Sequence, residues 1–459
     1  MNTRWIVLYL ALFAVPIAST AMPGAKTDFA ALESTVSAEL RRNDVPGCAV
    51  AVVLGQEIVF AKGFGTANVD TGEPVSADSL FRLGSTTKMF TAAALVSLAE
   101  DRKLALDAPV GDYVKGLNPK FARLTSHQLL THTAGLADET KMEGLHDESA
   151  LGEGLRARDD SLCFTEPGRI WSYSNPGYWL AGLVVEEVSG RRYADAVRER
   201  VLAPLGMKRS TLRPTEAMTW PLAVGHDPEG NGAPRVIRPL ADNAAGWPAG
   251  QLFTSANEYA RFCIAFVNGG RLEGKQTLSP FVIEKLSTPH VPVPGGQRHY
   301  GYGVGVEDSD GLRWLSHSGN RSGYGSLVKM CPAKKFGVII LCNKTGASLP
   351  RVAEKAIEVV LGISPPKREP RTKPLPLTEE ELQSFAGVYS NGKTTIRLVA
   401  RDGKLLAPAG GEMTKIGENR FRRTGGVAGP DSEFVFVPGE DGRIEYLVRG
   451  GRALKKSTR

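Results

Sequence analysis

The chain has 459 residues, of which 42% are hydrophobic, 23% charged and 7% aromatic. This composition provides apolar material for one large core or two smaller ones, and it excludes a disordered or fibrous protein. Lysine and arginine number 56 and aspartate and glutamate 49, a formal net charge of +7, but the charges are scattered along the chain, so no nucleic-acid partner is expected.

The first residues have the pattern of a secretory signal peptide over 1–21. Arg4 supplies a positive charge, Trp5 to Ile17 form an apolar run, and Ser19 to Ala21 form a small-residue cleavage site. A retained membrane anchor is the alternative, but the run has only about a dozen strongly apolar residues where a spanning helix needs about 20. We therefore expect cleavage and an exported protein, periplasmic or secreted.

The region after this segment mixes helix and strand patterns. The first helix shows apolar residues at four-residue spacing, and a later one opens with a capping box of Ser255 and Glu258. Strand patterns flank the helical middle of the region, which predicts an α+β domain whose sheet is completed by the later half of the chain. The predicted elements, in chain order, span 29–42, 48–54, 58–61, 85–100, 255–267, 302–306, 326–330 and 336–341.

The five cysteines are far apart and include no C-x-x-C pair, so a zinc site is not expected. Cys331 and Cys342 flank a predicted hairpin. If Cys331 faces Phe336, however, antiparallel register places Cys342 opposite Gly325 and not opposite Cys331. We therefore expect mostly buried free thiols.

The end of the chain is organised differently. Residues 364–376 are rich in proline and charge, which is typical of a semi-rigid linker. Beyond it, strands are predicted over 395–399, 433–437 and 444–448, separated by Asp-Gly turns. We expect a small β-rich C-terminal domain over 377–459, lipocalin-like or another barrel.

The most informative motif is S-x-x-K, formed by Ser85 and Lys88 at the start of a predicted helix. Residues three apart share a helical face, so the hydroxyl and the amine can come within hydrogen-bonding distance. A lysine can take the proton of a serine nucleophile if burial lowers the pKa of its amine. Taken alone, the motif also fits a serine N-cap followed by a solvated lysine.

Two further segments carry related chemistry. Tyr173 and Asn175 form a Y-x-N in a turn-rich loop, where a tyrosine can relay protons. His317 and Gly319 form an H-x-G on a strand predicted to enter a turn, where Gly319 allows close approach of the backbone and the next amide can stabilise an oxyanion together with the amide of Ser85. Each also has an ordinary structural interpretation, as a buried tyrosine or a structural histidine.

Taken together in this order, the three motifs resemble those of the serine β-lactamase and penicillin-binding-protein superfamily, especially the class C β-lactamases and the β-lactamase-like esterases. The resemblance spans most of residues 29 to 362 and extends to the segments 129–136, 204–207, 249–252 and 300–303. It implies a β-lactamase/transpeptidase-like domain over 22–363, with an antiparallel sheet flanked by helices and an all-helical subdomain.

The resemblance also implies roles for individual residues. Ser85 is expected to be the acylated nucleophile, Lys88 to help deprotonate it, and Tyr173 to be the general base that later passes a proton to the leaving group. No metal and no cofactor are implied. Substrate-binding and oxyanion roles are implied for Asn175, His317, Ser318, Gly319 and Asn320.

The sequence departs from the family pattern in the third motif. Many β-lactamases have K-T-G where this chain has His317, Ser318 and Gly319. The lysine is a permanent cation, whereas histidine is largely neutral at pH 7 unless a neighbour raises its pKa. This departure makes efficient β-lactam hydrolysis doubtful and favours an esterase or peptidase.

Three other residues have side chains that could serve a site. His127 and His132 are five apart without an acidic partner, so a metal site is not expected, and His132 is predicted to brace the loop beneath the site. Trp247 fits either a substrate cleft or the core.

The sequence therefore predicts an exported serine hydrolase that cleaves an ester or amide through an acyl-enzyme on Ser85, with a small-molecule ester, amide or peptide as its substrate. A true class C-type β-lactamase or a peptidase acting on cell-wall D-amino-acid peptides is the enzymatic alternative. A catalytically silent peptidoglycan-binding or scaffold protein is the alternative outside enzymes. Cell-wall association and the oligomeric state are left open.

Overall fold

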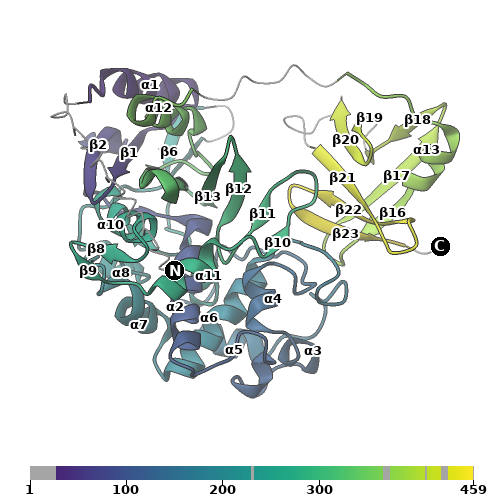
Figure 1. Ribbon diagram of the computed structural model, residues 1–459, viewed down its shortest axis with the longest axis horizontal. Coiled ribbons are helices and arrows are strands. Elements are labelled where there is room, and N and C mark those ends of the chain that lie inside the picture. The colour runs from purple at the N-terminus through teal and green to yellow at the C-terminus, as the bar shows by residue number, and fades with distance from the viewer. Residues whose placement is uncertain (1–26, 229–231, 365–372, 409–410, 425–432, 458–459) are drawn as a thin grey trace, which may run out of the picture.

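The computed structural model describes residues 27–228, 232–364, 373–408, 411–424 and 433–457. The chain forms an α+β domain and a separate closed β-barrel (Figure 1). The predicted signal peptide, 1–21, and most of the predicted linker, 364–376, lie outside the described residues. No helix in the described part of the chain is both long and apolar enough to cross a membrane.

The α+β domain is centred on one antiparallel sheet with the strand order β10-β11-β12-β13-β14-β15-β1-β2-β3. Its strands are β1 (Gly47–Leu54), β2 (Glu57–Asn68), β3 (Glu73–Pro74), β10 (Val291–Pro292), β11 (His299–Tyr300), β12 (Gly305–Ser309), β13 (Leu312–Arg321), β14 (Tyr324–Cys331) and β15 (Phe336–Cys342). Strand pairs outside this sheet are β4 (Phe81–Arg82) with β7 (Phe253–Thr254), β5 (His226–Pro228) with β6 (Pro234–Val236), and β8 (Arg271–Leu272) with β9 (Lys275–Gln276).

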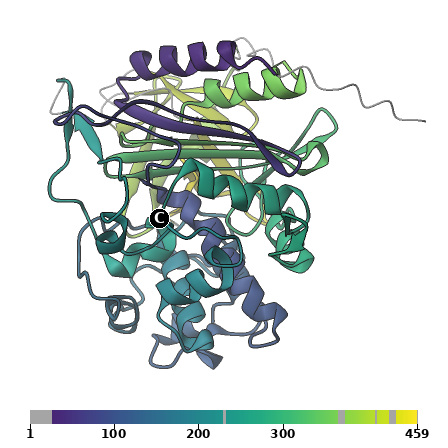
Figure 2. The ribbon, with the colours of Figure 1, turned by 90° about the vertical axis from the view of Figure 1, so that its left-hand side faces the viewer.

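Helices cover both faces of this sheet (Figure 2). They are α1 (Ala30–Arg42), α2 (Thr87–Glu100), α3 (Pro119–Ala122), α4 (Ser126–Leu130), α5 (Ala150–Arg156), α6 (Asn175–Ser189), α7 (Tyr193–Val197), α8 (Pro214–Ala217), α9 (Trp247–Gly250), α10 (Ala256–Val267), α11 (Pro280–Ser287) and α12 (Pro350–Leu361). Shorter turns of helix are η1 (Gly84–Thr86), η2 (Val110–Asp112), η3 (Arg198–Leu202), η4 (Ala244–Gly246) and η5 (Pro332–Lys334).

The sheet is completed by the later half of the chain, as the sequence predicts. The first strand, β1, lies between β2 and β15, and Cys48 is opposite Cys342. Within the β14–β15 hairpin, Cys331 pairs with Phe336 and Gly325 with Cys342, which is the predicted register. All five cysteines are free thiols, and four of them are buried.

The two faces of the sheet pack against different helices. Figure 2 shows α1 and α12 side by side over one face and α10 with the helical region on the other. Because side chains alternate along a strand, Val50 and Val52 of β1 join the cluster beneath α1 and α12, while Ala51 and Val53 join the main core. The α+β fold class expected from the sequence is confirmed.

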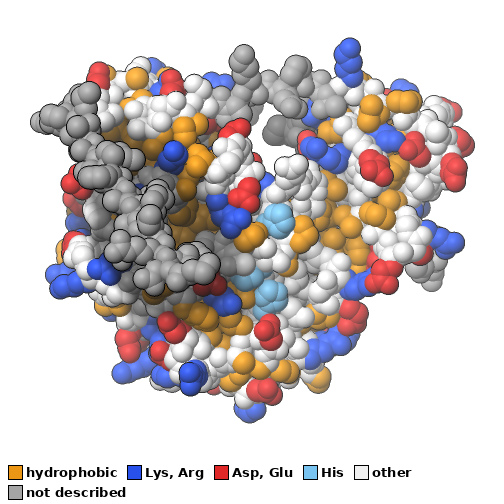
Figure 3. All heavy atoms as spheres, in the orientation of Figure 1, with side chains coloured by type: hydrophobic (Ala, Val, Ile, Leu, Met, Phe, Trp, Pro, Cys, Tyr) orange, Lys and Arg blue, Asp and Glu red, His pale blue; other side chains and the backbone are white. Residues whose placement is uncertain are grey.

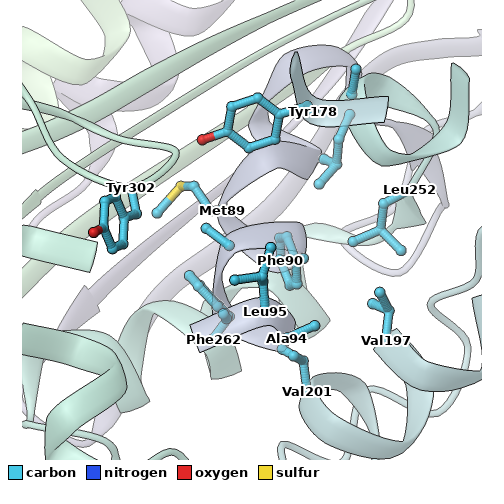
Figure 4. Close-up of a cluster of buried hydrophobic side chains, with 14 of the residues drawn as sticks. Met89, Phe90, Ala94, Leu95, Tyr178, Val197, Val201, Leu252, Phe262 and Tyr302 are labelled. Atoms are coloured by element: carbon cyan, nitrogen blue, oxygen red, sulfur yellow. The ribbon is translucent and has the colours of Figure 1, made fainter. Parts of the chain in front are cut away.

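Helix α2 lies at the centre of the main core. Figure 4 shows its side chains Met89, Phe90 and Leu95 among residues of other helices and loops, including Phe262 and Leu252. A helix that is apolar on every side is stable only when it is fully enclosed. The turn before α2, which carries Ser85, is therefore attached to a rigid element.

The C-terminal domain is a closed barrel with α13 (Glu379–Phe385) packed against it. Its interior is filled by aromatic side chains, among them Phe385, Phe421 and Phe436, so the barrel encloses a packed core. The strands are β16 (Gly387–Ser390), β17 (Thr395–Arg401), β18 (Lys404–Leu406), β19 (Glu412–Gly417), β20 (Arg420–Thr424), β21 (Glu433–Pro438), β22 (Ile444–Arg449) and β23 (Arg452–Lys456).

Three local predictions need correction. The helix predicted from residue 85 begins as the 3-10 turn η1. Residues 302–304 are not strand, because Gly303 has a φ of +74°, and a Cβ there would come 2.7 Å from the Lys88 carbonyl oxygen. Ser255 caps α10, but the Glu258 carboxylate accepts hydrogen bonds from the Arg209 amide and from Ser210, so the capping box is incomplete.

The barrel packs directly against the α+β domain. Ile170 forms an apolar cluster with Tyr446 and Val448 of β22, and the hydroxyls of Tyr446 and Thr165 lie 2.6 Å apart. On the face shown in Figure 3, basic and acidic side chains are interspersed over both domains. This distribution agrees with the scattered charges of the sequence.

Candidate active site

Ser85 and Lys88 are adjacent at the buried start of α2. The Lys88 Nζ lies 3.3 Å from the Ser85 Oγ. It also donates to the Asn175 Oδ1 at 2.7 Å and to the Ala249 carbonyl oxygen at 2.8 Å. The S-x-x-K motif is thereby joined to the Y-x-N motif by a direct hydrogen bond.

Burial of Lys88 favours its neutral form. The residue is fully buried, and burial lowers the pKa of its amine well below the usual value, while the charge of Asp138 opposes this and those of Arg452 and Arg321 reinforce it. A neutral amine has two N–H donors and one lone pair. With the two donors directed at Asn175 and Ala249, the lone pair remains for the Ser85 hydroxyl proton.

Tyr173 and Asn175 are placed by the start of α6. Ser174 caps this helix by accepting the Gly177 N–H at 3.4 Å, and Asn175 is its first residue. Burial raises the pKa of the Tyr173 phenol, while its hydrogen bond with the Ser85 side chain and the charge of Arg452 work in the opposite direction. Tyr173 is therefore a protonated phenol at neutral pH, able to donate a proton beside Ser85.

His132 supports the Tyr173 loop from beneath. Its Nδ1 accepts the Ser174 backbone N–H at 3.1 Å, and its ring centre lies 4.2 Å from that of Tyr173. Burial lowers the pKa of His132 well below its usual value. It is thus a neutral acceptor that holds the loop, the bracing role expected from the sequence.

The third motif lies on β13, which runs past the Ser85 turn. A Cβ on Gly319 would come 1.9 Å from the Leu83 carbonyl oxygen, and one on Gly84 would come 2.7 Å from the Asn320 backbone nitrogen. Only glycines allow the two segments to lie this close. The strand continues to Arg321 and is followed by a turn, so His317 lies in its interior, on the strand that the sequence predicts to enter a turn.

His317 is a neutral side chain with two partners. Its Nδ1 lies 2.7 Å from the Ser318 carbonyl oxygen, which fixes a proton on that nitrogen, and its Nε2 lies 3.0 Å from the Tyr300 hydroxyl. Burial and the charge of Lys88 lower the pKa of His317 to about 3. No positive charge develops on His317 at any pH near neutrality.

Two cavities adjoin these residues. The smaller, of about 140 Å³, is lined by Ser85, Thr140, Met142, Asn175, Trp179, Ala249, Gly250, Asn320, Arg321 and Arg452. The larger, of about 500 Å³, contains Tyr173, His317 and Ser318 and continues between the domains to Val435 and Val448 of the barrel. Both cavities therefore include residues of the C-terminal domain.

The contribution of the barrel is the β22–β23 hairpin. Its Gly451 carbonyl oxygen accepts the Tyr173 backbone N–H at 2.9 Å, and the Ala453 N–H donates to the Ser172 hydroxyl at 3.1 Å. The Arg452 guanidinium lies 4.7 Å from the centre of the Tyr173 ring. A segment more than 270 residues away in sequence thus holds the Tyr173 loop.

Sequence reasoning located one part of this site and missed another. The structure brings together the predicted residues Ser85, Lys88, Tyr173, Asn175, His317, Ser318, Gly319 and Asn320 around the two cavities. It also places Asp138, Arg321 and Arg452 beside them, and none of these has a local motif that could have identified it. Trp247 is buried and donates to Asp242, so it belongs to the core. No group of three metal-binding side chains occurs within the described ranges.

Comparisons with known proteins relate the chain to one family. The Beta-lactamase family model matches residues 32–362. Penicillin-binding protein 4 of Amycolatopsis lactamdurans is 28% identical over 318 residues, which are 65% of this chain and 81% of that protein. Other curated relatives are matched over 61–64% of their own length, so the chain spans less than two thirds of those proteins.

Solved structures match both domains. The octameric penicillin-binding protein homologue from Pyrococcus abyssi has a TM-score of 0.67 and 27% identity, over 94% of this chain and 100% of that chain. SurE has a TM-score of 0.77 and 24% identity, over 93% of this chain and 98% of that chain. The likeness to SurE shows a shared fold that includes the C-terminal barrel.

Proposed function

The chain belongs to the Beta-lactamase family, and we propose that it is an exported serine hydrolase that cleaves an ester or amide through an acyl-enzyme on Ser85. The observation that carries the proposal is the environment of Lys88, whose two N–H donors are occupied and whose lone pair is left for the Ser85 proton. Export rests on the composition of residues 1–21.

Acylation begins when Lys88 takes the Ser85 proton and Oγ attacks the substrate carbonyl carbon. The oxyanion lies near the backbone amides of Ser85 and Asn320, which belong to the closely packed η1 and β13 segments. As the carbonyl re-forms, the bond to the leaving group breaks, and the Tyr173 phenol gives its proton to the departing oxygen or nitrogen. The acyl-enzyme then carries a Lys88 ammonium beside a Tyr173 phenolate.

Deacylation reverses these transfers with water. The phenolate takes one proton from the water whose oxygen attacks the acyl carbon. The ester bond to Ser85 breaks, Lys88 returns its proton to Oγ, and the acid is released. The site thereby returns to its starting protonation state, and the net reaction consumes one water.

Ester or peptide cleavage fits the site better than β-lactam hydrolysis. His317 is neutral, so it offers no fixed charge to the carboxylate of a penicillin or cephalosporin. The larger cavity of about 500 Å³ runs from Tyr173 toward the barrel and has room for an extended leaving group such as a peptide. A peptidase is therefore the second candidate.

The test is turnover and acylation of the purified full-length protein with a short-chain p-nitrophenyl ester, a D-amino-acid peptide and a chromogenic cephalosporin. We expect hydrolysis of the ester or the peptide, weak or absent cephalosporin turnover, and no activity in Ser85→Ala. Activity that survives in Ser85→Ala, or an inert wild type that no fluorophosphonate probe labels, contradicts the proposal.

A further inference from the structure

Arg321, the last residue of β13, is a buried cation with two unpaired nitrogens. Its exposed fraction is 5%, and its Nε and Nη2 have no hydrogen-bond partner among the residues that the structure describes. Burying a guanidinium with unpaired N–H groups is costly. The residue nevertheless lines the small cavity that contains Ser85.

Asp242 is the carboxylate whose charge acts on Arg321, but its oxygens already have other partners. Its Oδ1 accepts hydrogen bonds from Trp247 and Gln251, both at 2.9 Å, and lies 4.0 Å from the Arg82 Nη2. The charge of Asp242 acts on Arg321, but its Oδ2 lies 3.1 Å from the His146 Nδ1 and neither oxygen is hydrogen-bonded to Arg321. Asp242 therefore cannot satisfy the Arg321 donors in this arrangement.

The other carboxylate of this region, Asp138, is held by Arg452 through two hydrogen bonds. Three arginines thus accompany two carboxylates, and one positive charge has no counterion among these groups. Burial lowers the pKa of Arg321 to about 10 while Asp242 opposes the shift, so the side chain is charged at neutral pH. A ligand that balances this charge would be an anion.

The unpaired atoms of Arg321 indicate the geometry of that anion. Nε and Nη2 form one edge of the guanidinium, and this is the same edge by which Arg452 binds Asp138. A carboxylate accepts two parallel hydrogen bonds from such an edge. Both atoms are buried, so a ligand in the cavity reaches them only if the guanidinium turns toward it.

In the proposed reaction, the small cavity would hold the acyl group. Tyr173, which protonates the leaving group in the proposed reaction, lines the larger cavity, so the leaving group lies there. The acyl group then extends past Asn175 toward Arg321 in the cavity of about 140 Å³. A cavity of about this size holds benzene, so the acyl side chain has roughly six non-hydrogen atoms.

We propose that Arg321 is a specificity-determining residue that binds a carboxylate on the acyl side chain of the substrate. The preferred acyl donors are monoesters or amides of short dicarboxylic acids of about the length of glutarate, or peptides with an acidic residue at the acyl position. This inference rests on the proposed function, because it assumes acyl transfer to Ser85.

The first experiment compares p-nitrophenyl monoesters of glutarate and valerate, which differ in a terminal carboxylate, with the uncatalysed rate subtracted. We expect kcat/KM for the glutarate ester to exceed that for the valerate ester by about tenfold to hundredfold, the effect of a charge-assisted hydrogen-bond pair. Arg321→Gln should reduce this ratio to about one. The matched control, Arg313→Gln, changes an exposed arginine of the same strand that pairs with Asp308 and should keep the wild-type ratio.

A second measurement needs no variant, so it holds even if Arg321→Gln does not fold. Free glutarate should inhibit valerate ester hydrolysis by the wild type competitively and at least tenfold more strongly than valeramide. Equal inhibition by the two compounds overturns the inference. A third ester, 4-carboxyphenyl valerate, carries its carboxylate on the leaving group and tests which cavity holds the acyl group. If the enzyme prefers this ester and the preference is lost in Arg321→Gln, the acyl group does not lie in the small cavity.

The outcomes separate this inference from the function on which it rests. If the valerate ester acylates Ser85 but the glutarate ester gains nothing, the hydrolase function stands and the role of Arg321 is wrong. If neither ester nor a fluorophosphonate reacts at Ser85, the proposed function itself fails, and the inference fails with it.

Discussion

Asp138 and Arg452 form an ion pair that joins the two domains at the candidate active site. The Asp138 Oδ2 accepts from Nε and Nη2 of Arg452 at 2.9 and 2.7 Å, and its Oδ1 accepts the Asn175 backbone N–H at 2.8 Å. Arg452 also lies over the Tyr173 ring. The barrel therefore helps to set the position of both residues of the Y-x-N motif.

Removing this contact should slow the reaction. Arg452→Gln is expected to reduce kcat/KM for a neutral ester about tenfold to hundredfold, since charge-assisted hydrogen bonds contribute about 1.5–3 kcal/mol each. The loss should fall mainly on kcat, because Tyr173 transfers protons in the proposed reaction. Arg443→Gln, which changes a barrel arginine whose side chain is 90% exposed, should keep wild-type kinetics. An unchanged rate in Arg452→Gln refutes the positioning role.

Removing the whole barrel should leave a folded α+β domain with reduced activity. A protein ending at Gly362 keeps the buried residues of the three apolar clusters that belong to the α+β domain alone, and it loses the cluster that Ile170 forms with Tyr446. We expect a soluble domain that unfolds cooperatively in thermal circular dichroism, with ester hydrolysis reduced at least as much as in Arg452→Gln. A truncated protein that is insoluble shows instead that the two domains share one core.

The pH dependence should be set by Lys88 and not by His317. Lys88 acts as a neutral amine, so kcat/KM should fall as pH decreases through its lowered pKa. His317, with a pKa of about 3, is neutral throughout this range. His317→Gln should therefore leave the acid limb of the pH profile where it is in the wild type. A limb that disappears in this variant identifies His317 as the titrating group.

Strand β13 lies so close to the Ser85 turn that adding one methyl group at Gly319 should lower both stability and activity. A Cβ on Gly319 would meet the Leu83 carbonyl oxygen at 1.9 Å, so Gly319→Ala must displace backbone. We expect a loss of about 1–3 kcal/mol in the free energy of unfolding, as for other overpacked sites, together with reduced activity. Gly296→Ala, where nothing lies within 4 Å of the added atom, is the control in urea unfolding. Equal stability of the two variants contradicts the packing described here.

The sequence predicted those parts of the site whose geometry is local. Ser85 and Lys88 are three residues apart, and Tyr173 and Asn175 two apart, so their relative positions follow from one helix start each. The hairpin register around Cys331 followed in the same way. The capping box predicted for Glu258 failed because the interaction that replaces it is not local. The Arg209 N–H and the Ser210 hydroxyl, from a distant segment, donate to the Glu258 carboxylate.

Long-range contacts explain what the sequence could not predict. Arg452 reaches the site only because a hairpin of the barrel packs on the Tyr173 loop. Arg321 is one of many charged residues in the sequence, and its lack of a partner becomes evident only once Asp242 is seen to bind other groups. Neither the position of Arg452 nor the unpaired nitrogens of Arg321 can be predicted from the spacing of nearby residues or from composition.

The central claim, acyl transfer to Ser85 with Lys88 as its base, is tested most directly by intact-mass and peptide-mapping analysis of the full-length protein during ester turnover. We predict an adduct with the mass of the acyl group on the peptide containing Ser85, no adduct in Ser85→Ala, and at least a thousandfold slower formation in Lys88→Met, a loss of about 4 kcal/mol. An adduct on another residue, or turnover that continues in Ser85→Ala, contradicts the account.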